Sequence, residues 1–333
     1  MPGMGLGGAG GLPIVLLHGS ALAALLSAFG SLLFSGFLAP PAAARLDAAE
    51  RAAVSRLCSA ASRWSLVLAI ILELAWLLAE SQFIAGAASL GQLAAALPVV
   101  IRATIFGQAA VAQILALIVA LVVFRRGHGT RIAAGLAGLA TALEALHLHG
   151  AAMHEGASPI LISELLHVLA AGAWLGGLLP LALFVRTAPP ASGAIAARRF
   201  SAFAGPLVLV LAGTALWQGR ILVGNVSALF DTLYGRIALT KLFLFVILIA
   251  FAARHRLELT PALSRAEPLA ARRSLTRSVL QEMAIGLAIV FVAAVIAGLP
   301  PPSDMAMSEA MPHAAPHGIS LVPVQSAPAA APG

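Results

Sequence analysis

Eight apolar segments dominate the chain, and each is long enough to cross a lipid bilayer as a helix. A spanning helix needs about 20 apolar residues, because each residue adds about 1.5 Å toward a hydrocarbon core of about 30 Å. Charged or Pro/Gly-bearing breaks separate these segments, which cover residues 12–38, 64–87, 97–124, 132–152, 160–185, 201–224, 235–253 and 279–298. The sequence therefore predicts an all-α polytopic membrane protein with eight transmembrane helices.

The amino-acid composition agrees with a membrane protein and limits which binding partners are expected. Charged residues make up 10% of the 333 positions, whereas a soluble domain has about 25%. The net charge of +7 comes from basic residues in short loops, where membrane topology accounts for them, so we expect a lipid bilayer and no nucleic acid as partner. The single cysteine, Cys58, excludes an internal disulfide framework and a cysteine-cluster metal site. No P-loop is present, and we do not expect an enzyme.

The first apolar segment is followed by "APPAAA", which resembles a signal-peptide cleavage site. It lacks a basic region before it and is longer than the 7 to 15 apolar residues of a signal peptide. We expect it to remain as the first helix.

Arginines predict the orientation of the helices. Sixteen of the 20 Lys and Arg residues lie in the loops after helices one, three, five and seven, and the other side holds Arg102, Arg220, Arg236 and Lys241. Because cytoplasmic loops carry the excess of Lys and Arg, these odd-to-even loops are predicted to be cytoplasmic. Both termini are then periplasmic, in a protein of the bacterial inner membrane.

Short sequence matches indicate an internal duplication. "LLH" at 16–18 recurs at 165–167, and each is followed at the same distance by "APP"; "FGQ" at 106–108 resembles "YGR" at 234–236. Gln113 and Lys241 each lie six residues beyond the glycine of the latter pair. We predict parallel copies of a four-helix unit, with an N-terminal half at 1–152 and a C-terminal half at 153–300. Chance similarity between Ala/Leu-rich helices is the alternative.

Ionisable side chains gather at the predicted periplasmic ends of helices one, four and five. Such groups cost roughly 2.5–3.5 kcal/mol each at the centre of a membrane and are functional candidates by default. The candidate metal ligands are His18, His147, His149, His154, Glu164 and His167. The i,i+3 spacing puts Glu144 on one face with His147, and Glu164 on one face with His167. A glutamate can fix the tautomer of a ligand histidine or bind the metal itself. Solvated interfacial histidines are the competing interpretation.

Three further charged groups lie inside predicted spans. Glu73 and Glu80 share a face of helix two and indicate either a cation path or ion-pair partners for Lys241, which alternatively extends its ammonium to the interface. The "GAWLG" at 172–176 has the small-residue spacing of a helix packing site.

Beyond Pro300 the chain becomes rich in Met, His, Pro and Ala. This tail, 301–333, has too few large apolar groups to fold alone and is predicted to be disordered. Thioethers and imidazoles suit copper, especially Cu(I). The tail's candidate ligands are Met305, Met307, Met311, His313 and His317. Low-complexity drift is the alternative origin of this composition.

Several longer stretches resemble the copper resistance protein D (CopD) family of bacterial inner-membrane proteins. They are "LLHGSALAALLSAFGSLLFSGFLAPP", "LLHVLAAGAWLGGLLPL", "RRFSAFAG", "YGRIALTKLFLF" and "EMAIGLAIVFVAAVIAGLPP", and the similarity is best from about 160 to 300. The resemblance implies copper homeostasis, with copper ion as the bound metal and periplasmic copper carriers as donors. His18 and His167 match the family's membrane histidines. The family's Gly-His-Ala segment meets "HLHGAAMHEG" here, so either His147 or His149 is its counterpart.

The sequence thus favours a membrane protein that binds copper at its periplasmic face and moves it into or across the membrane. In this interpretation His18 and His167 form a pair contributed by the two halves, and the tail captures copper. The first alternative is a membrane b-type haem protein or redox-assembly factor with bis-His ligation, because histidines on neighbouring helices can supply two axial ligands. The second is a structural or assembly factor in which the histidines hold no metal.

Overall fold

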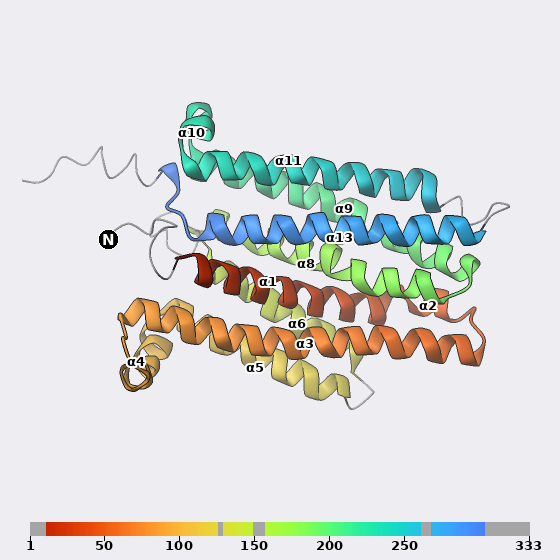
Figure 1. Cartoon of the computed structure of the whole chain (residues 1–333), viewed down its shortest axis with the longest axis horizontal. Helices are drawn as coiled ribbons and strands as arrows, with labels where there is room; N and C mark the ends of the chain where they lie inside the picture. The colour runs from red at the N-terminus through yellow and green to blue at the C-terminus, as the bar shows by residue number, and fades with distance from the viewer. Residues whose placement is uncertain (1–10, 126–128, 149–156, 261–267, 304–333) are drawn as a thin grey trace, which may run out of the picture.

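The protein is a bundle of long helices that run up and down one common axis (Figure 1). The computed structural model describes residues 11–125, 129–148, 157–260 and 268–303, and within these ranges it contains no strand. The first half comprises α1 (Gly11–Leu33), η1 (Phe34–Leu38), α2 (Pro40–Ala43), α3 (Ala48–Ala85), α4 (Leu90–Ala103), α5 (Ile105–Arg125), α6 (Thr130–Leu143) and η2 (Glu144–His147). The second comprises α8 (Ala157–Thr187), α9 (Pro190–Val223), α10 (Val226–Asp231), α11 (Leu233–Arg254), η3 (His255–Leu259) and α13 (Pro268–Ala297).

Seven helical segments in the described residues are long and apolar enough to span a membrane, and a shorter apolar helix, α4, accompanies them. The predicted all-α, multi-pass membrane class is thereby confirmed. The predicted fourth span, 132–152, corresponds to α6 and η2, which together run from Thr130 to His147. This segment is shorter than the sequence predicts, and residues 149–152 lie outside the described ranges.

Two helices form the centre of the bundle. The most apolar windows of α1 and α8 are 67% and 72% buried, whereas that of the α11 segment is 6% buried. Both central helices run from the same end of the bundle to the other, and the first and last described residues lie together at the end where α1 begins (Figure 1). We call this the histidine end, because His18 lies near it. The opposite end, where Arg45 and Arg186 lie, is the arginine end.

Backbones of α1 and α8 meet where their glycines face each other. A Cβ on Gly30 would overlap the backbone of Gly172, Gly176 and Gly177, and a Cβ on Gly176 would overlap the carbonyl oxygen of Leu26. Small residues allow this approach, which maximises van der Waals contact where no hydrophobic effect drives helix association. The predicted packing role of "GAWLG" is confirmed by these contacts.

Helix α3 is longer than its predicted span of 64–87, because it continues beyond the apolar stretch. Its first turn has a capping box, in which the Asp47 side chain accepts from the Glu50 N–H and the Glu50 side chain accepts from the Asp47 N–H. Gly86 ends the helix with φ of 60°, a left-handed conformation that glycine adopts without steric cost.

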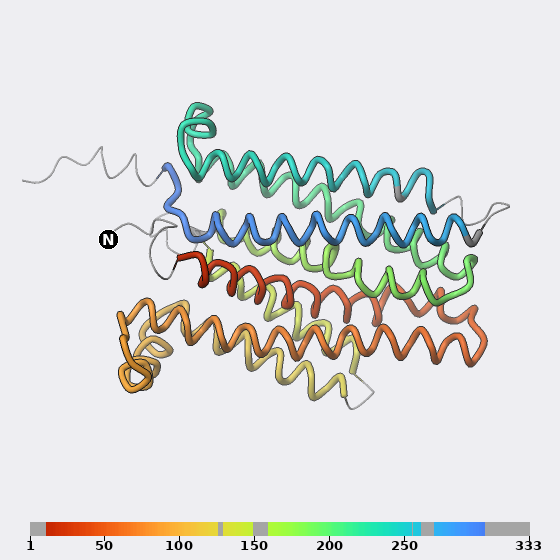
Figure 2. The backbone as a smooth tube through the Cα atoms, viewed as in Figure 1, coloured from red at the N-terminus to blue at the C-terminus, as the bar shows by residue number. Residues whose placement is uncertain are grey.

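The predicted span at 97–124 is in fact two helices, α4 and α5, which meet at Thr104. The Thr104 hydroxyl donates to Val100 O and accepts from the Gly107 N–H, so one side chain ends α4 and caps α5. A matching turn joins α10 to α11, where Thr232 donates to Ala228 O and accepts from the Gly235 N–H. Figure 2 shows both turns at the histidine end, α4 in orange and α10 in teal. The two halves therefore share this local structure at the positions of "FGQ" and "YGR".

Candidate metal centre

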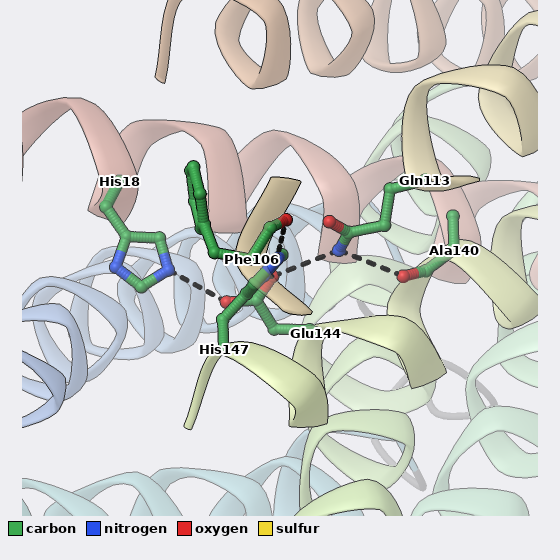
Figure 3. Close-up of polar contacts among 6 residues, drawn as sticks. All are labelled: His18, Phe106, Gln113, Ala140, Glu144 and His147. Atoms are coloured by element: carbon green, nitrogen blue, oxygen red, sulfur yellow. Dashed lines mark hydrogen bonds and ion pairs between the residues drawn. The ribbon is translucent and has the colours of Figure 1, made fainter. Parts of the chain in front are cut away.

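One buried carboxylate, Glu144, connects side chains from three helical segments at the histidine end (Figure 3). His18 Nε2 lies 2.8 Å from Glu144 Oε1. The other oxygen, Oε2, accepts from Gln113 Nε2 at 3.1 Å and lies 3.4 Å from His147 Nδ1. We call these four residues, His18, Gln113, Glu144 and His147, the Glu144 cluster. Glu144 has no exposed surface, and its negative charge is stabilised by these donors instead of by water.

Local structure positions each member of the cluster. Helix α6 tightens into the single 3₁₀ turn η2, which contains both Glu144 and His147, and their i,i+3 spacing sets the two side chains together as predicted. Gln113 is fixed on α5, because its amide also donates to Ala140 O at 3.1 Å. The cluster therefore joins α1, α5 and η2, which are far apart in the sequence.

Aromatic rings enclose the two imidazoles. The His18 ring stacks on Trp76 with a centroid distance of 4.1 Å and an interplanar angle of 10°. His147 meets the same indole edge to face at 4.8 Å, and Phe106 lies 5.3 Å from His147. His147 Nε2 also lies 3.4 Å from Phe106 O. These walls bury most of the surface of both imidazoles, and electrostatic interactions are stronger in such surroundings than in water.

The tautomer of His18 follows from its partner. A carboxylate only accepts, so His18 donates through Nε2–H and keeps the lone pair of Nδ1. This is the arrangement in which a second group orients a histidine that binds a metal. Glu144 thus has the position expected for a carboxylate that orients a metal ligand.

His167 has an equivalent partner in the other half. The Thr214 hydroxyl donates to Val210 O at 2.7 Å, so it accepts from His167 Nδ1–H at 2.8 Å. The lone pair of His167 then lies on Nε2. Lys241 on α11 is close enough for its charge to interact with this imidazole. Thr214 therefore contacts one ring nitrogen of His167, and the orienting role that the sequence suggested for Glu164 stays a prediction.

The predicted ligands divide into three groups in the structure. His18 and His147 come together at Glu144, whereas Glu164, which is buried, and His167 lie on α8. The remaining candidates lie outside the described residues: His149, His154, Met305, Met307, Met311, His313 and His317. Within the described ranges no group of three or more His, Cys, Asp or Glu side chains is arranged to hold a metal ion. No contact there joins His18 to His167, so their pairing remains a prediction.

Sequence reasoning did not include Glu144, Gln113 or Trp76 among the site residues. The Glu-x-x-His spacing did place Glu144 beside His147, but its bond to His18 spans 126 positions. The sequence marks Gln113 only through its position in the internal duplication. It does not mark Trp76 at all, because aromatic residues are common in apolar helices.

Comparisons with known proteins identify relatives for both halves. Residues 10–160 match the family model described as copper resistance protein D-like, N-terminal domain, and residues 194–296 match the model for copper resistance protein D.

Two curated relatives match about half of the chain. The copper transport protein CutJ of Bacillus subtilis (strain 168) is 32% identical over 162 residues, which are 47% of this chain and 28% of CutJ. The copper resistance protein D of Pseudomonas syringae pv. tomato is 33% identical over 176 residues, 49% of this chain and 56% of that protein. The chain thus matches well under two thirds of the length of each. No solved structure matches.

Proposed function

Because the chain belongs to the copper resistance protein D family, we propose that it binds copper at the histidine end and moves the ion into or across the membrane. Copper is the substrate in this proposal, and the chain is not an enzyme. The names of the two relatives, a copper transport protein and a copper resistance protein, support copper handling. The membrane class of the fold supports a role in passage across a bilayer.

The observation that carries the proposal is the Glu144 cluster. It buries one carboxylate between two imidazoles in a membrane protein, an arrangement with a large desolvation cost that a functional site explains. Imidazole nitrogen is a good copper ligand, and Glu144 holds His18 with one ring nitrogen available. In this proposal His18 and His147 are the principal ligands within the described residues.

Further ligands complete the proposed pathway. His149, His154, Glu164 and His167 are the other candidates at the histidine end, and the Met/His-rich tail 301–333 captures the ion before it enters. A periplasmic copper carrier is the proposed donor. The orientation follows from the arginine loops, which put the arginine end in the cytoplasm and both termini in the periplasm of the inner membrane.

Copper titration of the purified protein and copper uptake into reconstituted vesicles test the proposal together. His18→Ala and His147→Ala should each remove most high-affinity binding and uptake. His255→Ala is the matched control, because His255 begins η3 at the arginine end. Wild-type affinity in both cluster variants would refute the assignment of the site. A Soret band in the purified protein would instead favour the haem alternative.

Reporter fusions test the orientation independently. A fusion near Arg265 should report the cytoplasm, and a fusion at the C-terminus should report the periplasm. A cytoplasmic C-terminus would put the histidine end on the wrong side for a periplasmic donor.

A further inference from the structure

A second buried carboxyl group, Glu73 on α3, lies near the Glu144 cluster but is bonded quite differently. Glu73 has no exposed surface. Neither of its carboxyl oxygens has a hydrogen-bond partner among the residues that the structure describes. Glu144, by contrast, accepts from His18, His147 and Gln113. The two carboxyl groups are close enough for their charges to interact.

Glu73 lies one helical turn from Trp76, which contacts the cluster. The two residues are three positions apart on α3, so they lie on the same helix face, and Trp76 stacks on His18. Glu80 lies seven positions from Glu73, toward the histidine end, and is only partly buried. Glu80 is close enough to His18 and His147 for electrostatic interaction with both.

The helices packed on α3 bring few other charges to this end. They are α1, α4, α5 and α8. Their titratable or charged side chains near the histidine end are His18 on α1, Arg102 on α4, and Glu164 and His167 on α8, while η2 adds Glu144 and His147. Arg102 is exposed, and α5 adds only the neutral Gln113. No ion pair joins Glu73 to a described cation.

Burial of an ionised carboxylate without donors is strongly unfavourable, and a neutral carboxylic acid avoids most of that cost. At Glu144, by contrast, hydrogen bonds from the donors stabilise the ionised form of the carboxylate. When two neighbouring carboxyl groups have such different surroundings, one remains ionised and the other holds a proton, which assigns them different chemical roles. The bonding pattern assigns the negative charge to Glu144 and the proton to Glu73.

We propose that Glu73 holds a proton while the Glu144 cluster is empty, and releases that proton when a copper ion binds there. The Glu73 O–H bond breaks, the proton leaves toward the periplasm through Glu80 and water, and the new carboxylate compensates the charge of the ion. One proton is exchanged for one monovalent cation, and nothing is oxidised or reduced. This inference rests on the proposed function, to which it adds proton exchange as the means of charge compensation.

Infrared spectroscopy of the metal-free protein tests the proton on Glu73. Wild-type protein should show the band of a protonated carboxylic acid, and Glu73→Gln should lack it. Glu258→Gln, which changes an exposed glutamate in η3, should keep the band. Absence of a Glu73-dependent band in wild-type protein would overturn the inference whether or not copper binds.

Addition of Cu(I) under anaerobic conditions then tests the exchange. The band should disappear as copper binds, and a pH indicator in weakly buffered solution should record about one proton fewer per copper for Glu73→Gln than for wild type. Gln replaces a neutral acid of the same shape, so the variant is expected to fold. A band that persists with copper bound, or an unchanged proton count in the folded variant, would overturn the exchange. If wild-type protein binds no copper, the proposed function and the exchange both fail, and the band still decides whether Glu73 is protonated.

Discussion

Replacing Glu144 by Gln should weaken both copper binding and the fold, by amounts that can be measured separately. The carboxylate has two accepting oxygens, which face His18 at 2.8 Å and Gln113 and His147 at 3.1 and 3.4 Å. The Gln side chain has one accepting oxygen and one donating nitrogen. In at least one of these contacts its N–H group would therefore face another N–H donor.

The expected magnitude follows from these contacts. The mismatch costs about 1–3 kcal/mol of unfolding free energy, because a buried donor loses its acceptor. Copper affinity should fall by about 10 to 100-fold, the usual effect of removing a group that orients a metal ligand. That fall corresponds to about 1.4–2.7 kcal/mol of binding free energy.

Competition between the purified protein and a copper chelator measures the affinity, and a thermal melt in the same detergent measures the stability. Glu258→Gln serves as the control, because its side chain is 67% exposed at the arginine end. A folded Glu144→Gln variant with wild-type copper affinity would show that this carboxylate does not orient the copper ligands.

Three further outcomes are expected. Gly176→Ala should lower the melting temperature, at a cost of about 1–3 kcal/mol, because its Cβ overlaps the α1 backbone, whereas Gly213→Ala, whose Cβ meets nothing within 4 Å, should not. Thr214→Val removes the acceptor of His167 and should reduce copper affinity in the chelator assay by about 10-fold; no change would show that Thr214 does not orient a copper ligand. Removal of residues 303–333 should slow copper uptake at low concentration but leave the membrane site loadable, and complete loss of binding would instead assign the main site to the tail.

The fold was predictable from the sequence where hydrophobicity alone determines it. Long apolar segments must be helical in a bilayer, because every backbone polar group needs an internal partner. The break at Thr104 was not predictable in this way, since one hydroxyl in an apolar run barely changes hydropathy. The start of α3 was also missed, because the helix begins in a polar stretch that a search for apolar segments ignores. Asp47 and Glu50 cap this polar extension.

The candidate site was predictable only in part. His18 and His147 stand out because ionisable groups are rare in apolar segments. The role of Glu144 as their common partner depends on how α1 packs near η2, and no local pattern contains that information. The same holds for Trp76, whose contact with His18 arises from the packing of α3 on α1.

The close approach of α1 and α8 at Gly30 and Gly176 limits how the two halves can move against each other. Backbones in direct contact cannot approach each other further, so we expect any relative motion to be a rocking about this point. His18 lies 12 positions from Gly30, which gives a lever arm of about 18 Å. A rotation of about 10° then shifts His18 relative to α8 by about 3 Å, comparable to the length of a hydrogen bond. The contact at these glycines would therefore be the pivot of the motion. A small tilt of one half about it would change the distance between His18 and His167.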